Sequence, residues 1–134
     1  MTFLVMSDPV TFCRALADPT RWRVACLTLD EALCVCELAD ILEMPQSSVS
    51  SHVQVIRKAG LLESETCGKW TYFRIHRDHR KLITSVARSF GTAGNATAAR
   101  DAARAAARLA AREDSCCPRP KHLTSRRRSQ PARP

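Results

Sequence analysis

Glycine and aromatic residues are scarce in this sequence, and long hydrophobic runs are absent. Its 134 residues include four glycines and 5% aromatic residues, which excludes fibrous and collagen-like classes. The longest apolar runs span a few residues, whereas a membrane helix needs roughly 20 in succession, so we expect no membrane partner. Hydrophobic residues still make up 45% of the sequence, which is enough for the core of one compact domain.

The first eight residues also lack the features of a secretory signal, because they contain no basic segment and no long apolar stretch. We therefore expect no signal peptide. Without a secretory signal, the seven cysteines are expected to be free thiols or ligands of soft metals rather than a disulfide framework.

Positive charge is unevenly distributed along the chain. The formal net charge is +8, of which residues 1–91 carry +1 and residues 92–134 carry +7. We expect a folded domain over residues 1–91 and an Ala/Arg-rich extension over residues 92–134, helical to about residue 112 and disordered beyond it. The excess of basic over acidic residues lies mainly in the extension, so the net charge does not by itself show that the folded part binds nucleic acid.

Two helix starts can be recognised from their capping residues. Asp8-Pro9 and Asp18-Pro19 each place an N-cap aspartate before a proline whose fixed φ suits the first helical position. A third helix is predicted over about residues 35–44, where the next proline ends it.

The following segment completes a helix-turn-helix pattern. After a short turn, residues 47–60 repeat the apolar side chains Val49, Val53 and Ile56 at helical spacing. Ser47 is expected to cap this fourth helix. Two helices joined by a short turn, the second beginning with short polar side chains, are typical of a helix-turn-helix.

Residues 61–75 change to a strand pattern. Residues 70–75 are rich in β-forming side chains, and residues 67–69 supply a turn, which predicts a β-hairpin. An amphipathic helix follows over about residues 78–90. The predicted fold is therefore mostly α with a small β-hairpin: four helices, the hairpin and a last helix, which is the order of a winged helix-turn-helix.

Four separated stretches then point to a known family: residues 15–23, 33–39, 46–62 and 68–74. Through them, residues 8–90 resemble the ArsR/SmtB family of metal- and metalloid-responsive bacterial repressors. The resemblance implies a cytoplasmic homodimer that binds its own double-stranded operator DNA and leaves it when an inducer binds. The sequence LCVCEL in the second stretch resembles the arsenite-responsive branch.

The fourth helix is the expected reader of DNA, because a helix fits the major groove and its first turns approach the base edges. Polar side chains near its start are the candidates for base contacts: Gln46, Ser47, Ser48, Ser50, Ser51 and His52. Basic side chains on this helix and the hairpin are the candidates for phosphate contacts: Arg57, Lys58, Lys69 and Arg74. The alternative is that the serines only cap the helix and that His52 is a solvated surface residue.

Cys34 and Cys36 lie at the expected start of the third helix. We expect them to bind arsenite or antimonite as the inducer, because sulfur ligands suit soft ions. The helix dipole is expected to lower the pKa of a thiol there. Residues i and i+2 of a helix point about 200° apart. Both sulfurs could then bind one ion only if the first turn unwound, which would disturb the DNA-reading helix and release the operator.

A third sulfur ligand is missing from this helix. The arsenic site of the resembling branch can draw a third cysteine from one turn later, where this sequence has Ala39. Cys116 and Cys117 in the tail are the candidates for an auxiliary or independent site, and the alternative is a tail pair without function. The arginines of the extension could add salt-sensitive DNA contacts or be solvated.

Other functions stay open at this point. The same thiols could sense Cd²⁺, Pb²⁺ or Zn²⁺, or oxidants through disulfide formation. An arsenate reductase or disulfide oxidoreductase would need a Cys-x-x-Cys pair or a phosphate loop in a βαβ unit, and the sequence shows neither, so we expect no enzyme. A nucleoid-type protein would bind DNA without sequence preference and would not respond to arsenite.

Overall fold

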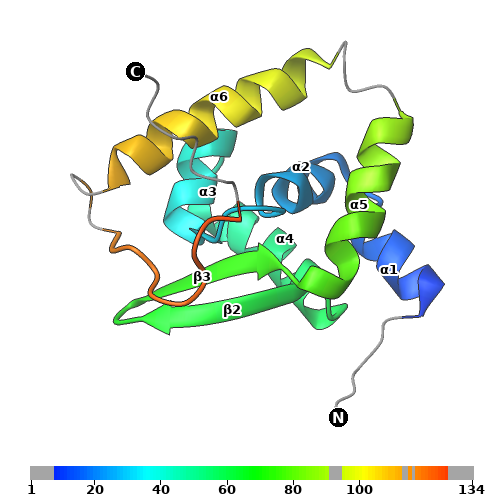
Figure 1. The fold of residues 1–134 in the computed structure, drawn as a ribbon, viewed down its shortest axis with the longest axis horizontal. Coiled ribbons are helices and arrows are strands. Elements are labelled where there is room, and N and C mark those ends of the chain that lie inside the picture. Colours follow the sequence, from blue (N-terminus) through cyan, green and yellow to red (C-terminus); the bar gives the residue numbers. More distant parts are fainter. Residues whose placement is uncertain (1–7, 91–94, 113–114, 116, 127–134) are drawn as a thin grey trace, which may run out of the picture.

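The structure, a computed structural model, describes residues 8–90, 95–112, 115 and 117–126. Its elements follow the order of a winged helix-turn-helix (Figure 1). They are α1 (Pro9–Leu16), α2 (Pro19–Leu27), β1 (Leu33–Cys34), α3 (Val35–Leu42), α4 (Gln46–Lys58), β2 (Leu62–Cys67), β3 (Trp70–Ile75), α5 (Arg77–Ser89) and α6 (Ala96–Ala110). The predicted fold class is confirmed, with β1 as an addition. Among the described helices, none is both long and apolar enough to cross a membrane.

The first two helices begin where aspartate side chains satisfy free backbone N–H groups. Asp8 accepts a hydrogen bond from the N–H of Thr11 (2.9 Å). Asp18 accepts from the N–H groups of Thr20 (2.9 Å) and Arg21 (3.0 Å). These bonds satisfy donors that have no partner within the helix. Both helix starts predicted from the sequence are confirmed.

The start of α4 differs from the prediction. Pro45 is its N-cap residue, has extended backbone angles and makes no side-chain cap. Ser47 lies inside the first turn, where its backbone carbonyl accepts a hydrogen bond from the hydroxyl of Ser51 (3.1 Å). The expected cap by Ser47 is therefore wrong, because the helix begins at Gln46, two residues earlier than a cap at Ser47 implies.

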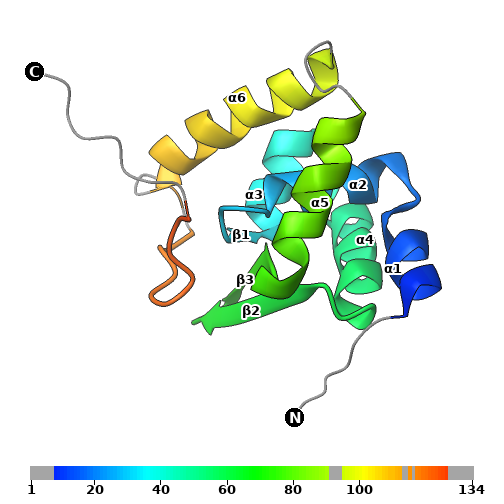
Figure 2. The same ribbon diagram turned by 45° about the vertical axis from the view of Figure 1, so that its right-hand side comes forward.

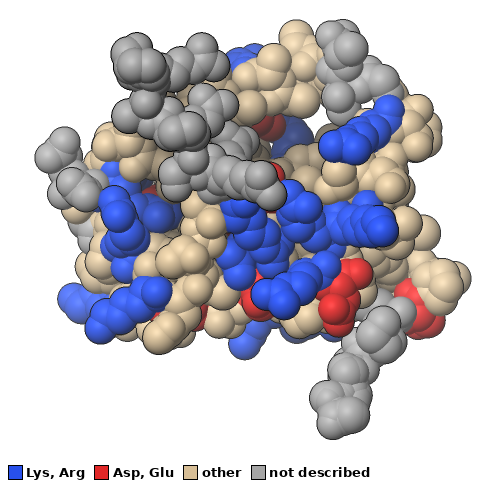
Figure 3. All heavy atoms as spheres, in the orientation of Figure 1, with Lys and Arg blue, Asp and Glu red and all other residues tan. Residues whose placement is uncertain are grey.

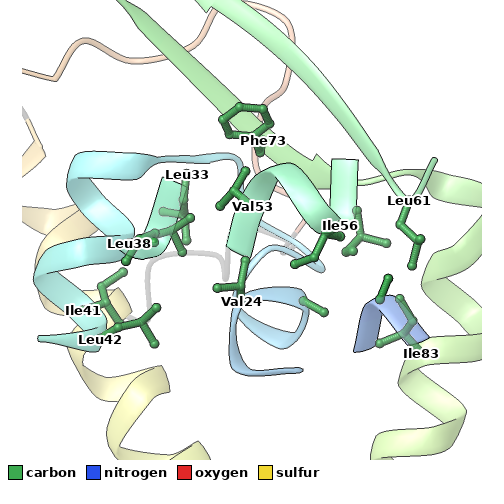
Figure 4. Packing of buried hydrophobic residues seen from close by; sticks show 14 of the residues in the cluster. Val24, Leu33, Leu38, Ile41, Leu42, Val53, Ile56, Leu61, Phe73 and Ile83 are labelled. Atoms are coloured by element: carbon green, nitrogen blue, oxygen red, sulfur yellow. The ribbon is translucent and has the colours of Figure 1, made fainter. Parts of the chain in front are cut away.

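The main core lies between the helices and one face of the sheet. Val49, Val53 and Ile56 of α4 are fully buried, as their helical spacing predicted. Figure 4 shows Phe73 pointing from the sheet toward the helices, on the side where Val53 lies. Burial of each such side chain stabilises the fold by about 1.5–3 kcal/mol. This packing holds α4 in place and leaves side chains such as Gln46, Ser47 and Ser51 exposed.

The sheet has the strand order β1-β3-β2, and both pairs are antiparallel. Leu33 of β1 lies opposite Phe73 of β3, and both face the main core. Side chains alternate along a strand, so Cys34 and Tyr72 face the other side, where they belong to a second buried cluster with Cys117. β1 was not predicted, because two residues are too few to show a periodicity.

Helix α6 packs against α2 and α3 (Figures 1 and 2). Three of the extension's arginines pair with three acidic residues in or next to α3, an arrangement that we call the arginine ladder. Its pairs are Arg104 with Glu43 (2.8 Å), Arg108 with Asp40 (2.9 Å) and Arg112 with Glu37 (2.7 Å). These three arginines are therefore not simply solvated, which was one expectation from the sequence, and the salt-sensitive DNA contact stays a prediction.

Residues 117–126, which we call the C-terminal arm, lie over the sheet (Figure 1, orange to red). The backbone N–H of Arg126 donates to the carbonyl of Asp30 (2.8 Å), and its guanidinium pairs with Glu63 (2.8 Å). Leu123 packs against the second cluster. The expectation of disorder beyond residue 112 is wrong for the arm, because these contacts fix it to the rest of the molecule.

Candidate functional site

Helix α4 keeps its predicted DNA-reading residues outside the buried stripe. Exposed are Gln46, Ser47 and Ser51, and half-buried are Ser48, Ser50 and His52. Arg57 and Lys58, at the end of the helix, are exposed as well. Helix α4 thus carries the predicted polar residues in its first half and two exposed basic side chains, Arg57 and Lys58, in its last turn.

His52 also contacts the start of α2. Its Nδ1 lies 3.8 Å from the carboxylate of Asp18 and 3.5 Å from the guanidinium of Arg21. Asp18 is the N-cap of α2, so this contact links the polar face of α4 to the helix packed behind it. His52 is therefore not a freely solvated residue, and its ring is held by two neighbours.

The two predicted wing residues have different environments. Lys69 is exposed at the turn between β2 and β3. Arg74 is 8% exposed, donates to the carboxylate of Glu63 (2.9 Å) and donates to the carbonyl of Thr124 in the arm (2.6 Å). We therefore leave Arg74 out of the candidate phosphate contacts, because its guanidinium is turned inward and its donors are engaged.

Further basic residues near Arg74 are paired in the same way. In Figure 3, Lys and Arg side chains gather across the middle of the face that carries the arm and α5, and carboxylates lie among them. Arg80 pairs with Asp30, and Arg126 pairs with Glu63. This patch therefore offers less free positive charge than its arginines suggest.

Three cysteines form a cluster at the opposite end of α3 from the turn that leads into α4. The sulfur atoms of Cys34, Cys36 and Cys117 lie within 4.8 Å of one another, and those of Cys34 and Cys117 are 3.5 Å apart. Cys34 and Cys117 are buried, and Cys36 is half-buried. The sequence predicted the first two as ligands and Cys117 only as an auxiliary residue, whereas the structure unites all three. Cys116 lies outside the described residues.

The expected unwinding of α3 is not needed. Cys34 is the N-cap residue, with φ −90° and ψ 169°, so its backbone is extended and lies outside the helix. Cys36 is the second helical residue. The angle of about 200° between residues i and i+2 applies only within a helix. The two sulfurs therefore converge across the start of α3 with the helix intact, and the argument from helix geometry was wrong.

The electrostatic expectation for Cys34 is also wrong. Burial, and then the negative charge of Glu37, raise the pKa of the Cys34 thiol, although a hydrogen bond from the Glu37 N–H acts in the opposite direction. Glu37 is fully buried and accepts a hydrogen bond from the N–H of Cys34 (3.1 Å). The loss of water around the sulfur thus outweighs the hydrogen bond from the Glu37 N–H.

Two arginines of the ladder surround this cluster. Arg112 donates to both carboxylate oxygens of Glu37 (2.7 and 2.9 Å) and to the carbonyl of Ala32 (2.9 Å). Arg108 places one N–H-bearing nitrogen 3.5 Å from the sulfur of Cys117. Neither residue was predicted to have a role at the thiols, although the arginines recur every four residues and the acidic residues every three, and both spacings keep side chains on one face of a helix.

The cluster borders a hollow of about 280 Å³ that reaches the DNA-reading side. Its lining includes Cys34, Cys36, Gln46 and Lys69. Gln46 begins α4 and Lys69 lies at the tip of the wing, so two predicted DNA contacts share this hollow with two of the clustered cysteines. The thiols therefore lie close to both parts of the predicted DNA-binding surface.

Known proteins similar to this chain include arsenic and cadmium resistance regulators. The chain is 35% identical over 85 residues to the arsenic resistance transcriptional regulator ArsR1 of Pseudomonas putida, which is 63% of this chain and 66% of that protein. It is 32% identical over 81 residues to a cadmium resistance transcriptional regulatory protein CadC homolog of Staphylococcus aureus, which is 60% of this chain and 67% of that protein. The chain thus spans slightly less than two thirds of the Pseudomonas relative.

The fold is shared with a solved structure from Mycobacterium bovis, a homodimeric winged helix-turn-helix DNA-binding domain. The TM-score is 0.58 at 24% sequence identity, over 62% of this chain and 78% of that chain. The sequence model of the family described as "Bacterial regulatory protein, arsR family" matches residues 18–64, from the start of α2 into β2. Family and fold are those of DNA-binding transcriptional regulators rather than enzymes. The chain is therefore a member of the ArsR family of bacterial regulatory proteins.

Proposed function

We propose that this protein is an arsenite- and antimonite-responsive transcriptional repressor of the cytoplasm, which binds operator DNA as a homodimer and leaves it when the metalloid binds. The observation that carries the proposal is the cluster of Cys34, Cys36 and Cys117, whose sulfurs lie within 4.8 Å of one another beside the hollow that reaches α4 and the wing. Three sulfur ligands in a compact group suit a trivalent, soft metalloid.

The binding reaction requires no change in charge. Arsenite is present at neutral pH as As(OH)₃, and three thiols replace its three hydroxyl groups. Three As–O bonds break and three As–S bonds form, while the proton of each thiol leaves with a hydroxyl group as water. The product is neutral, which favours its formation at a site where Cys34 and Cys117 are buried.

Dimer formation is supported by an exposed apolar surface on α1 and α5. Val10 is 61%, Leu82 52% and Phe90 85% exposed. The two helices are in contact, since the ring centroids of Phe12 and His79 are 5.7 Å apart. We propose that a second copy covers this surface, so that the two α4 helices read half-sites about one DNA turn apart.

The test is a titration of labelled upstream DNA with the full chain, with and without arsenite, followed by fluorescence anisotropy. Arsenite is expected to weaken operator binding by about 5- to 150-fold, the usual range of allosteric coupling. Cys34→Ser, Cys36→Ser and Cys117→Ser are each expected to reduce this response. Cys26→Ser is the matched control, because Cys26 is half-buried on α2 and belongs to neither the thiol cluster nor the proposed dimer surface. An unchanged response in all three cluster variants would refute the proposed site.

A second candidate function is a response to Cd²⁺ or Pb²⁺, and Arg108 favours it. Three thiolates and a divalent cation carry one negative charge in total, which a nearby guanidinium would stabilise. Arg108 lies 3.5 Å from the Cys117 sulfur, and among the described residues its Nη1 atom is buried without a hydrogen-bond partner. If Cd²⁺ releases the operator at lower concentration than arsenite, and Arg108→Gln weakens the Cd²⁺ response more, the divalent ion is the inducer.

A thiol-redox response is the remaining alternative, and the 3.5 Å between the sulfurs of Cys34 and Cys117 favours it. Oxidation would remove two electrons and two protons from the two thiols and join them in a disulfide. A thiol oxidant such as diamide would then release the operator without any metalloid. Reversal of that release by dithiothreitol would identify oxidation as the signal.

A further inference from the structure

One row of side chains crosses the sheet on its outer face. The strand register pairs Cys34 of β1 with Tyr72 of β3, and Tyr72 with Glu65 of β2. Residues paired in this way project on the same face of a sheet. A cluster sulfur, a phenol and a carboxylate therefore form a line that begins at the thiol cluster and ends in the wing.

The C-terminal arm follows this row. Cys117 lies 3.5 Å from Cys34 at one end, and the hydroxyl of Tyr72 donates to the carbonyl of Pro118 in the middle. At the other end of the row, Glu65 of β2 binds the backbone of the arm. Its carboxylate oxygens accept from the backbone N–H groups of Lys121 (2.9 Å), His122 (2.9 Å) and Leu123 (2.8 Å). The arm therefore joins the thiol cluster to the strand β2 (Figure 1).

The carboxylate of Glu65 accepts hydrogen bonds from three backbone N–H groups of the arm and from the thiol of Cys67. Loss of solvent raises its pKa, but the three backbone N–H donors together with the Cys67 thiol lower the pKa to about 2. The carboxylate is therefore charged at neutral pH and can hold all three donors at once. Hydrogen bonds to a charged acceptor are stronger than neutral ones.

A second attachment lies beyond Glu65. Arg126 donates its backbone N–H to the carbonyl of Asp30 and pairs with Glu63. Thr124 accepts a hydrogen bond from Arg74. These contacts hold the end of the arm, Tyr72 holds Pro118 next to the cysteine, and Glu65 holds residues 121–123 between them. Without the Glu65 anchor, residues 119–123 would form a longer loop, and the effective concentration of Cys117 at the cluster would fall.

We propose that Glu65 is a positioning residue of the metalloid site: it holds the arm so that Cys117 supplies the third sulfur, and metalloid binding in turn fixes the arm to the wing. This inference rests on the proposed function. Coupling of this kind is reciprocal, so whatever the anchor adds to metalloid binding, the bound metalloid adds to the attachment of the arm. The signal then reaches β2 and β3 through the arm, with α3 intact.

The test compares Glu65→Gln with wild type in the full chain, with Glu43→Gln as the matched control. Glu43 is also a paired glutamate, but its partner is Arg104 and it lies on α3's side of the molecule, away from the arm's anchor. Glu65→Gln is expected to weaken As(III) binding about tenfold, within the usual range of coupling. X-ray absorption is expected to show two As–S bonds in this variant, as in Cys117→Ser, and three in wild type and Glu43→Gln.

Hydrogen exchange of the backbone N–H groups of residues 121–123 provides a readout that needs no metalloid. These amides are expected to be protected in wild type and to exchange faster in Glu65→Gln, while circular dichroism confirms that the variant is folded. Added arsenite is expected to slow their exchange in wild type.

The two proposals fail in different ways. If wild type binds As(III) through three sulfurs and Glu65→Gln does so with equal affinity, the role of Glu65 is refuted and the repressor function stands. If wild type binds no As(III), the arsenite response itself is refuted, and the positioning role falls with it. Unchanged exchange of residues 121–123 in Glu65→Gln would refute the anchor whatever the inducer is.

Discussion

Helices α4 and α6 show how little the number of basic residues says about DNA contact. Arginine recurs every fourth residue in α6 and in the turn after it, so α6 looks like the better nucleic-acid helix in the sequence. In the structure, Arg104 and Arg108 of α6 and Arg112 after it pair with acidic residues in or next to α3 in the arginine ladder, whereas Arg100 is exposed and lies outside the ladder. Arg57 and Lys58 of α4 are exposed and, within the described part of the chain, form no such ion pair. We therefore expect the partner of a charge, rather than its sign, to decide which surface contacts the phosphates.

The largest effect is expected where the ladder is most buried. Arg112→Ala would leave Glu37, which is fully buried, without its bidentate partner. Loss of one member of a buried ion pair typically costs about 3–5 kcal/mol. We expect a decrease of this size in the free energy of unfolding, measured by urea denaturation under reducing conditions at fixed protein concentration. A decrease below about 1 kcal/mol would mean that the ladder does not hold α6 in solution.

The next effect concerns sequence reading by α4. Ser51→Ala or His52→Ala is expected to weaken binding to the operator by about 1–3 kcal/mol, the usual value of a base contact. Binding to random DNA should weaken less, and competition between the two DNAs measures the difference. Equal losses on both would assign these residues to general contacts, or to the packing of His52 on Asp18.

A smaller and different effect is expected at the exposed cations of α4. Arg57→Ala and Lys58→Ala should weaken operator and random DNA by the same factor, because phosphate contacts carry no sequence information. The slope of log affinity against log salt should fall in magnitude by about 0.9 for each phosphate that is no longer neutralised. Stability should change by no more than about 0.5 kcal/mol. A selective weakening on the operator would instead indicate that one of the two side chains reads bases.

The smallest effect is expected at the open end of the ladder. The pair of Arg104 and Glu43 is partly exposed, so Arg104→Ala should lower stability by at most about 1 kcal/mol. Operator affinity and its salt dependence should stay unchanged. A shallower salt slope in this variant would show that α6 contacts DNA after all, and the contrast between the two helices would fail.

Local signals in the sequence were sufficient for most of the fold. The aspartate caps at Asp8 and Asp18 act within three residues, and the buried stripe of α4 repeats at helical spacing. The hairpin likewise depends on a turn next to β-forming residues. Each of these signals lies within one element, which is why the winged helix-turn-helix could be predicted.

The thiol cluster could be predicted only in part. Cys34 and Cys36 lie close together in the sequence, but Cys117 is 83 positions from Cys34 and reaches it through the arm. The arm has the composition of a disordered segment, and its order comes from hydrogen bonds to Glu65 and Glu63 on β2. Long-range contacts of this kind leave no periodic pattern. The acidic residues of α3 and the arginine repeat were both visible, but their pairing was not.

The arginine ladder also protects the DNA-reading surface from the protein's own acidity. Glu37, Asp40 and Glu43 lie in or just after α3, which connects by a short turn to α4. If α6 came away, three carboxylates would be left uncompensated next to the recognition helix, and their field would oppose the approach of a polyanion. The basic extension is therefore expected to assist DNA binding from a distance, as an electrostatic shield that need not touch a single nucleotide.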